Sequence, residues 1–190
     1  MVATIDGNID TLAMNNISKS NKTNFSYKTL DDFVYFSIDS EELYVASICI
    51  CSNDTISVYH SSAALGDALY KKLPEGNWQK NETFEWDMRE TDTSNETVEK
   101  RIHFYQKNGW IANTMAMGKT GETEFIFNKS LFKNGKLTIA LGLMYAHDPE
   151  NILALPTTSK DGCGSLSLVS GSPEKSYKFD TDNWFSLTLE

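Results

Sequence analysis

The stretch FVYFSIDSEELYVASICICSNDTISVY, residues 33–59, decides the fold. Phe33, Tyr35 and Ser37 alternate with Val34, Phe36 and Ile38. Residues 55–59 have the same period of two, and residues 43–51 form an extended apolar run. A period of two places successive side chains on opposite faces of a strand, as in a half-buried sheet. The pair Asn53-Asp54 between two of these segments is typical of a turn. The stretch therefore predicts successive strands joined by tight turns.

The same pattern recurs along the rest of the chain. Further strands are predicted at residues 101–106, 110–117, 123–127, 136–145 and 184–189. Turn-forming residues separate such runs, and two of these places suggest hairpins, Asn108-Gly109 and residues 119–121. Short helical turns are expected at two places, residues 63–70 after a capping Ser61 or Ser62, and NKSLFKNG, residues 128–135. Residues 14–24 and 89–97 are expected to be long loops. We therefore predict an all-β fold, a jelly-roll-like antiparallel β-sandwich of about ten strands with one or two short helical turns.

The length and charge of the chain indicate its domain number and exclude some classes of binding partner. The 190 residues favour a single domain over residues 1–190, and a chain of this size can form its own core. Asp and Glu number 26 against 17 Lys and Arg, which gives a formal net charge of −9 without a basic patch. This composition argues against nucleic acid as a partner. The longest apolar run, residues 43–51, is too short to cross a bilayer, which takes about 20 residues.

The first residues of the chain and its Asn-X-Ser/Thr sequons bear on the cellular location of the protein. MVATIDGNID has neither a basic start nor an apolar middle, so the protein is either cytoplasmic or numbered after a removed leader. Asn-X-Ser/Thr sequons recur along the chain, and they indicate either glycan sites in a secreted eukaryotic protein or only a polar, turn-rich surface. We expect a secreted, periplasmic or cell-surface protein.

The three cysteines allow one disulfide at most. Cys49 and Cys51 lie two apart in an extended run, so both side chains project to one face about 7 Å apart and are poorly placed to bridge each other. Cys163, in the glycine-flanked segment DGCGS, could pair with either of them and leave one free thiol. Without CxxC spacing, zinc is not expected.

Several short motifs together resemble a known superfamily. The chain opens with IDGNID (5–10), carries ETEFIFNKSLF (122–132) and ends with DTDNWFSLTLE (180–190), with VYHSSAALGDALY, FEWDMRE and GWIANTMAMGKTGETEF between them. This order resembles the β-sandwich superfamily of DOMON domains and family 9 carbohydrate-binding modules, and within it an uncharacterised microbial group. The opening motif of that superfamily usually continues to a tryptophan, whereas this chain has TLAMNN. The resemblance implies a binding module without naming its ligand.

The resemblance to carbohydrate-binding modules implies tryptophans that stack on a sugar. Flat aromatic faces suit sugar rings because the axial C–H groups are apolar and slightly positive. Trp78 has polar neighbours and is expected to be the most exposed of the four tryptophans. Trp86, with Arg89 three residues on, could combine a platform with hydrogen-bond donors, and Trp110 begins a strand. With His60, these residues form the candidate carbohydrate site, although such tryptophans belong more often to a core than to a platform, as we expect above all for Trp184.

Two alternative functions stay open. Haem-binding DOMON domains ligate iron through a Met and a His, and this chain has candidates without a diagnostic spacing: Met14, Met88, Met115, Met117 and Met144, with His60, His103 and His147. An enzyme of unknown substrate could use His60 with an acidic residue. However, adjacent residues of a strand point to opposite faces, so the sequence His60-Ser61-Ser62 is better interpreted as a strand passing into a helical turn.

Carboxylates provide two weaker candidate sites. A pair for glycoside hydrolysis could come from Glu85, Asp87, Glu122 and Glu124, but alternation favours a solvated strand face for the last two. A structural calcium ion could be shared by the two ends of the chain through Asp6, Asp10, Asp180 and Asp182, if these lie on neighbouring strands. The sequence thus predicts a non-catalytic module outside the cytoplasm that binds carbohydrate, with no required cofactor, and it leaves the oligomeric state open.

Overall fold

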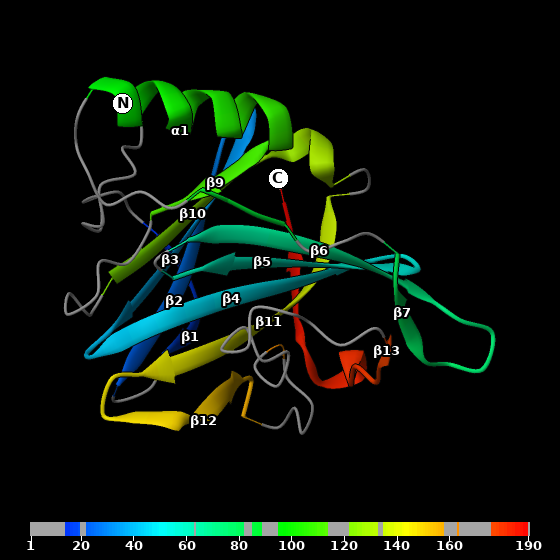
Figure 1. The fold of residues 1–190 in the computed structure, drawn as a ribbon. Helices are drawn as coiled ribbons and strands as arrows, with labels where there is room; N and C mark the ends of the chain where they lie inside the picture. The colour runs from blue at the N-terminus through cyan, green and yellow to red at the C-terminus, as the bar shows by residue number, and fades with distance from the viewer. Residues whose placement is uncertain are drawn as a thin grey trace.

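The fold consists of two antiparallel sheets. The computed structural model describes residues 14–19, 22–62, 64–81, 85–88, 95–113, 122–132, 135–157, 163 and 176–189. Figure 1 shows the strands β4, β5 and β6 of one sheet crossing in front of the strands β1, β2 and β3 of the other. The predicted all-β, sandwich-like fold is confirmed, with one sheet much larger than the other.

The smaller sheet, here called sheet A, has the strand order β1-β2-β3-β10-β9. Its strands are β1 (Asn15–Lys19), β2 (Thr23–Leu30), β3 (Phe33–Ser40), β10 (Glu122–Asn128) and β9 (Trp110–Ala112). Alternation along β3 and β10 turns Phe36, Phe125 and Phe127 toward the other sheet, and all three are fully buried. The opposite face of sheet A therefore carries the polar residues of the same strands.

The larger sheet, sheet B, has the order β12-β11-β4-β5-β6-β7-β13, with β14 paired to β11 and β8 paired to β6. Its strands are β12 (Asp148–Leu155), β11 (Lys136–Tyr145), β4 (Leu43–Ser52), β5 (Thr55–Ser61), β6 (Leu65–Lys72), β7 (Trp78–Lys80), β8 (Glu85–Met88), β13 (Ser176–Tyr177) and β14 (Phe185–Thr188). The predicted turn at Asn53-Asp54 joins β4 to β5, and Asn53 adopts a left-handed φ of 56°, which asparagine tolerates.

Both faces of sheet B are buried over part of their area. Between the sheets lies the inner core, to which β2, β3, β4, β10 and β11 all contribute. On the other face of sheet B lies a smaller cluster, the outer cluster, which includes Trp78, Phe179 and Trp184. Cys49 and Cys163 form a disulfide within it, with a Cα–Cα distance of 5.5 Å, and Cys51 is the free thiol. The Cys49–Cys163 disulfide is thus one of the two pairings that the sequence left open.

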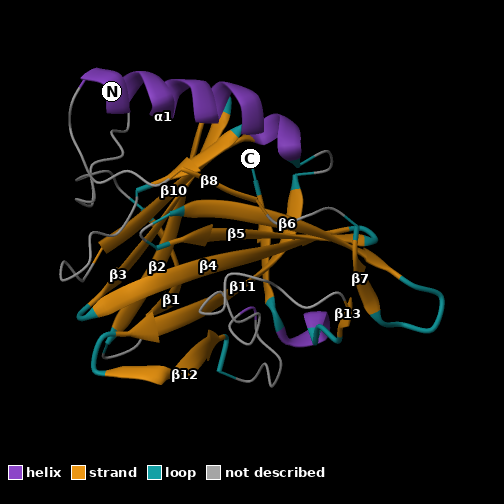
Figure 2. Ribbon diagram, viewed as in Figure 1, coloured by secondary structure: helices purple, strands orange, loops and turns teal. Residues whose placement is uncertain are grey.

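The helical content differs from the sequence prediction. Residues 65–70, expected in a helical turn, belong to strand β6, and residues 101–106, expected as a strand, lie in helix α1 (Asn95–Asn108). This helix also takes up the end of the expected loop at 89–97 and crosses one end of the sandwich (Figure 2). Asn108-Gly109 forms no hairpin, because Gly109, with a φ of 73°, follows the last residue of α1.

Two short 3₁₀ helices complete the described structure. Helix η1 (Lys129–Leu131) confirms a helical turn within residues 128–135, and the Asn128 side chain caps it by accepting from the Ser130 amide at 2.9 Å. Helix η4 (Thr181–Asn183) precedes Trp184. The expected hairpin at residues 119–121 lies outside the described residues. Within the described part of the chain, no helix has the length and apolar character needed to cross a membrane.

Candidate functional site

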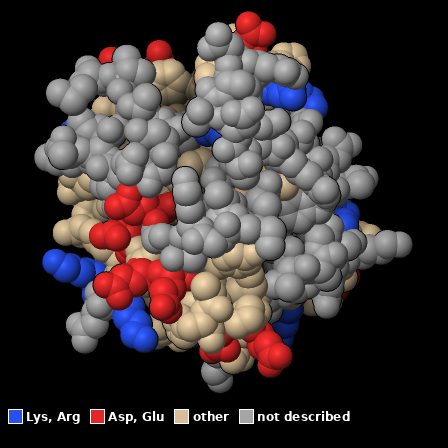
Figure 3. All heavy atoms as spheres, turned by 60° about the vertical axis from the view of Figure 1, so that its left-hand side comes forward, with Lys and Arg blue, Asp and Glu red and all other residues tan. Residues whose placement is uncertain are grey.

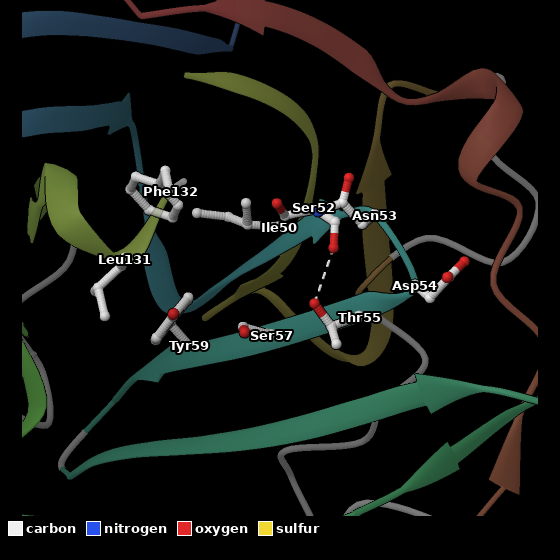
Figure 4. Close-up of a pocket in the computed structure, with 9 residues that line it drawn as sticks. All are labelled: Ile50, Ser52, Asn53, Asp54, Thr55, Ser57, Tyr59, Leu131 and Phe132. Atoms are coloured by element: carbon white, nitrogen blue, oxygen red, sulfur yellow. Dashed lines mark hydrogen bonds between the residues drawn. The ribbon is translucent and has the colours of Figure 1, made fainter. Parts of the chain in front are cut away.

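A pocket lies where the β4–β5 turn faces helix η1. Its volume is about 340 Å³, and Figure 4 shows its lining. Leu131, Phe132 and Tyr59 stand at one end, and Asn53 and Asp54 at the other. The nine lining residues are Ile50, Ser52, Asn53, Asp54, Thr55, Ser57, Tyr59, Leu131 and Phe132.

The floor of the pocket comes from the paired strands β4 and β5. Ile50 is directly opposite Ser57, and Ser52 is directly opposite Thr55, so these side chains share one face of sheet B. It is the face that carries the inner core, because Ile50 and Tyr59 both belong to that core. Near the turn, hydroxyl-bearing residues replace the apolar residues of the core. The pocket therefore lies at the edge of the inner core, where the core-facing side of β4 and β5 becomes polar.

The polar groups of the floor are held in place by local hydrogen bonds. The Thr55 hydroxyl donates to the Ser52 carbonyl at 2.8 Å, across the β4–β5 turn (Figure 4). Burial raises the pKa of Tyr59 to about 12, against a smaller lowering by a hydrogen bond with Ser57, and the charge of Asp67 adds to the rise. Tyr59 is therefore a neutral phenol at physiological pH and can both donate and accept a hydrogen bond.

The apolar wall of the pocket comes from η1 and the residue after it. Leu131 is 38% exposed, whereas Phe132 is buried in the inner core, with its ring 5.7 Å from that of Phe127. The two residues follow each other in sequence, so η1 anchors one side chain in the core and presents the other to solvent. One wall of the pocket is thus apolar and the floor is polar.

The predicted sugar-stacking tryptophans are buried where they are described. Trp78 is 2% exposed, so the expectation that it is the most exposed tryptophan is wrong. Its ring packs 6.0 Å from that of Phe179, and the ammonium group of Lys72 lies 5.7 Å from the ring centroid. Trp184 is buried as expected. The polar sequence around Trp78 was misleading because Phe179, which packs against it, is about a hundred residues away in the sequence.

Trp110 is also a core residue. It is fully buried, with its ring 5.0 Å from Tyr59 and 5.2 Å from Phe104 of α1. Its indole nitrogen donates to the Asp67 carboxylate at 3.3 Å. Trp110 therefore presents no open face to a ligand in this structure, but it contacts the ring of a residue that lines the pocket. The fluorescence emission of Trp110 can therefore report on ligand binding in the pocket, although Trp110 does not line it.

His60 is buried on the face of sheet B that carries the outer cluster. Its Nδ1 lies 3.0 Å from the hydroxyl of Ser47, the residue directly opposite on β4. Burial lowers the pKa of His60 to about 3, so the ring is neutral at physiological pH. Ser61 points to the other face of β5 and donates to the Asn113 carbonyl, while Ser62 stays close to Ala64. The His60-Ser61-Ser62 sequence is thus the end of a strand, but it does not lead into the predicted helical turn.

The other predicted site residues are only partly described. Gly66 is directly opposite both His60 and Trp86, so backbone pairing places Trp86 two strands from His60. Arg89 lies outside the described residues. Of the proposed haem ligands, His103 lies on α1, His147 follows β11 and pairs with Glu42, and Met144 is on β11. Met115 and Met117 fall outside the described residues.

The predicted calcium residues lie only partly within the described structure. Asp6 and Asp10 lie outside the described residues. Asp180 accepts a hydrogen bond from the Asn183 side chain at 2.8 Å, an Asx-type contact, and Asp182 is exposed on η4. Among the residues that the structure describes, no three His, Cys, Asp or Glu side chains gather closely enough to hold a metal ion.

One carboxylate is placed differently from its prediction. Glu124 was expected on a solvated strand face, but it is 0% exposed and accepts a hydrogen bond from the Tyr35 hydroxyl. Glu122 is half-buried on the same strand. The alternation of β10 was interpreted correctly, since both glutamates share the face opposite Phe125. The error concerned only the burial of that face.

Sequence reasoning missed the pocket itself. The only signal was the run of hydroxyl-bearing residues from Ser52 to Ser57 around a tight turn, at the end of an apolar strand. That run is also what an ordinary surface turn contains. A comparison of the chain with models of protein families, with curated proteins and with solved structures found no match.

Proposed function

We propose that this protein is a non-catalytic module that binds a carbohydrate or a related polyhydroxylated ligand outside the cytoplasm. The observation that carries the proposal is the pocket between the β4–β5 turn and η1, with four hydroxyl side chains, an amide and a carboxylate on one side and an apolar wall on the other. Sugars present hydroxyl groups and apolar C–H faces together, so they require both kinds of lining. The volume of about 340 Å³ lies at the lower end of small-molecule sites and suits one sugar unit.

The side chains that line the pocket suit ligand binding better than catalysis. Tyr59, Ser57 and Thr55 are neutral hydroxyls that donate and accept hydrogen bonds, which matches hydroxyl groups of a ligand. Glycoside hydrolysis requires a pair of carboxyl groups, and Asp54 is the one carboxylate among the described residues that line the pocket. The lining therefore supports recognition of a neutral, hydrogen-bonding ligand.

The disulfide supports a location outside the cytoplasm. Cys49 and Cys163 are joined within the outer cluster, and disulfides persist mainly in oxidising compartments such as the periplasm, the cell surface and the extracellular space. The disulfide is thus consistent with the proposed location outside the cytoplasm.

The test is a titration of tryptophan emission with a panel of soluble mono- and oligosaccharides. A ligand in the pocket will change the emission of Trp110, because the Trp110 ring lies 5.0 Å from Tyr59. Ser57→Ala and Leu131→Ala should each weaken binding several-fold, since one removes a hydroxyl and the other removes the apolar wall. Asp31→Ala, at the β2–β3 turn of the other sheet, is the matched control and should bind like the wild type.

Two outcomes would overturn the proposal. One is the absence of a saturable change with any sugar of the panel in protein shown to be folded. The other is binding that Ser57→Ala and Leu131→Ala leave unchanged. If such binding were lost in Trp86→Ala, the ligand would be assigned to the neighbourhood of β8 and not to this pocket.

A further inference from the structure

The pocket between the β4–β5 turn and η1 is longer than one sugar ring. Its floor on β5 runs from Thr55 at the turn to Tyr59 at the end where Leu131 and Phe132 stand (Figure 4). Four steps of about 3.3 Å along a strand separate Thr55 from Tyr59 by roughly 13 Å. A single pyranose ring spans only part of that length. A sugar whose hydroxyl groups reach the turn therefore leaves the other end of the pocket uncovered.

The polarity of the lining changes along this length. At the turn, Asn53 and Asp54 are exposed, and the oxygens of their side chains can accept hydrogen bonds from the hydroxyl groups of a ligand. At the other end, Leu131 and Phe132 present hydrocarbon, and the Tyr59 hydroxyl is already hydrogen-bonded to Ser57. The two ends of the pocket thus suit two different parts of one ligand, a hydroxylated part at the turn and an apolar part at η1.

Leu131 is held at the apolar end by the backbone around it. Its side chain packs on Gly109 so closely that a Cβ atom added to this glycine would lie 3.4 Å from a Cδ atom of Leu131. The Asn128 amide donates to the Gly109 carbonyl at 2.8 Å, which ties the start of η1 to the end of α1. The Lys129 amide donates to the Asp32 carbonyl, also at 2.8 Å, at the β2–β3 turn. The apolar wall is therefore preorganised, and a ligand loses little affinity in ordering it.

The exposure of Leu131 gives an apolar ligand group something to gain. Among the described residues, four large apolar side chains are exposed, those of Val98, Ile102, Leu131 and Leu153. Of these four, Leu131 lines the pocket. An apolar group placed against it removes hydrocarbon of both partners from water, and this burial favours binding in proportion to the area.

The charge of the molecule disfavours an anionic ligand. The chain has a formal net charge of −9, and Asp54 brings a negative charge to the pocket itself. Figure 3 shows Asp and Glu side chains gathered together on part of the surface. Lys71, directly opposite Thr55 on β6, shares the pocket's face of sheet B, but it is exposed and does not line the pocket. The field of such a protein repels uronates and sulfated sugars, so both parts of the ligand are expected to be uncharged.

We propose that the pocket selects a glycoside with a small apolar aglycone, the sugar hydroxyl groups lying at Asn53 and Asp54 and the aglycone against Leu131. This ligand class lies within the proposed carbohydrate-binding function, on which the inference rests. Leu131 determines the selectivity, because it supplies the exposed apolar contact. The volume of about 340 Å³ is at the lower end of small-molecule sites, which limits the aglycone to a group about the size of a phenyl ring.

The experiment is calorimetric titration with methyl and phenyl glycosides of glucose, galactose, mannose and N-acetylglucosamine. For a sugar that binds, the phenyl glycoside should bind roughly tenfold more tightly than the methyl glycoside, because the added ring buries apolar area. Leu131→Ala should reduce this ratio to about threefold or less, whereas Ser57→Ala should weaken both glycosides and keep the ratio. Leu153→Ala is the matched control, since Leu153 on β12 is 40% exposed against 38% for Leu131, and it should keep the wild-type ratio.

The outcomes separate this inference from the function on which it rests. If methyl glycosides bind and phenyl glycosides bind no more tightly, the inference fails and the carbohydrate function stands. A tenfold ratio that persists in Leu131→Ala would also overturn the inference, because the phenyl ring would then lie elsewhere. So would cellobiose or lactose binding as tightly as the phenyl glycoside, since the apolar end would then accept a second sugar. If no glycoside binds to protein shown to be folded by far-UV circular dichroism, the proposed function fails together with the inference.

Discussion

Burial of His60 makes the stability of the protein depend on pH. The folded state holds His60 neutral down to a pKa of about 3, whereas in the unfolded chain the ring takes up a proton near its ordinary pKa of 6.5. Between these two values the unfolded state binds one more proton than the folded state, so the free energy of unfolding falls as pH falls. The loss is about 1.4 kcal/mol per pH unit once the pH is below the unfolded pKa. Above pH 6.5 the contribution is fully present.

The measurement is urea unfolding at about pH 7.5 and about pH 5.5. Wild-type protein should lose about 1.4 kcal/mol from this one group across the interval, and His60→Gln should lose that much less, whatever its stability at the higher pH. Equal pH dependence in wild type and His60→Gln would contradict this prediction, because it would show that His60 takes up a proton as readily in the folded protein as in the unfolded chain.

At the scale of single residues, the alternation of apolar and polar side chains predicted which face each occupies but not whether that face is covered. Glu124 lies on the predicted face, yet it is buried and bonded to Tyr35, which is 89 residues away in the sequence. Trp78 has polar neighbours on both sides, yet Phe179 packs against it. Both partners come from distant parts of the chain, and a local pattern carries no information about them. The pocket was missed for the same reason, since its two walls are about 75 residues apart.

At the scale of elements, the disulfide ties strand β4 to a segment 114 residues later in the sequence. Closing so large a loop restricts the unfolded chain, so removal of the bond should cost about 2–5 kcal/mol. We expect Cys163→Ser to lower the free energy of urea unfolding by this amount, and Cys51→Ser to change it by about 0.5 kcal/mol or less. Thiol titration of the oxidised wild type should find one free thiol, that of Cys51. A Cys163→Ser variant as stable as the wild type would contradict this assignment.

Two elements show where sequence patterns fail to separate helix from strand. Residues 65–70 contain alanine and leucine, which favour helix, but pairing with β5 gives β6, in which Ala68 and Tyr70 face the outer cluster. Residues 101–106 alternate like a strand, yet they form part of α1, where Phe104 packs on Trp110 and Ile102 is 51% exposed. In windows of six residues, periods of 2 and 3.6 are poorly distinguished, and tertiary contacts decide. The longer runs, residues 43–51 and 136–145, were predicted correctly.

At the scale of the whole molecule, the inner core joins the two sheets into one structure. Phe25 and Phe127 come from sheet A, and Ile48 and Leu141 come from sheet B, and all four are fully buried in the same cluster. Neither sheet can keep these side chains from water without the other. The outer cluster is linked to the inner core through sheet B, whose strands contribute to both. The pocket therefore depends on the whole domain being folded.

This shared core predicts that the oxidised protein unfolds in a single cooperative transition. Tryptophan emission reports on both clusters, because Trp110 lies in the inner core and Trp78 and Trp184 lie in the outer cluster. Far-UV circular dichroism reports on the strands of both sheets. In urea the two signals should change with the same midpoint and the same slope, as for one two-state domain. If the emission changed at a lower urea concentration than the circular dichroism, the outer cluster would unfold separately, and the stabilisation attributed to the disulfide would apply to that cluster alone.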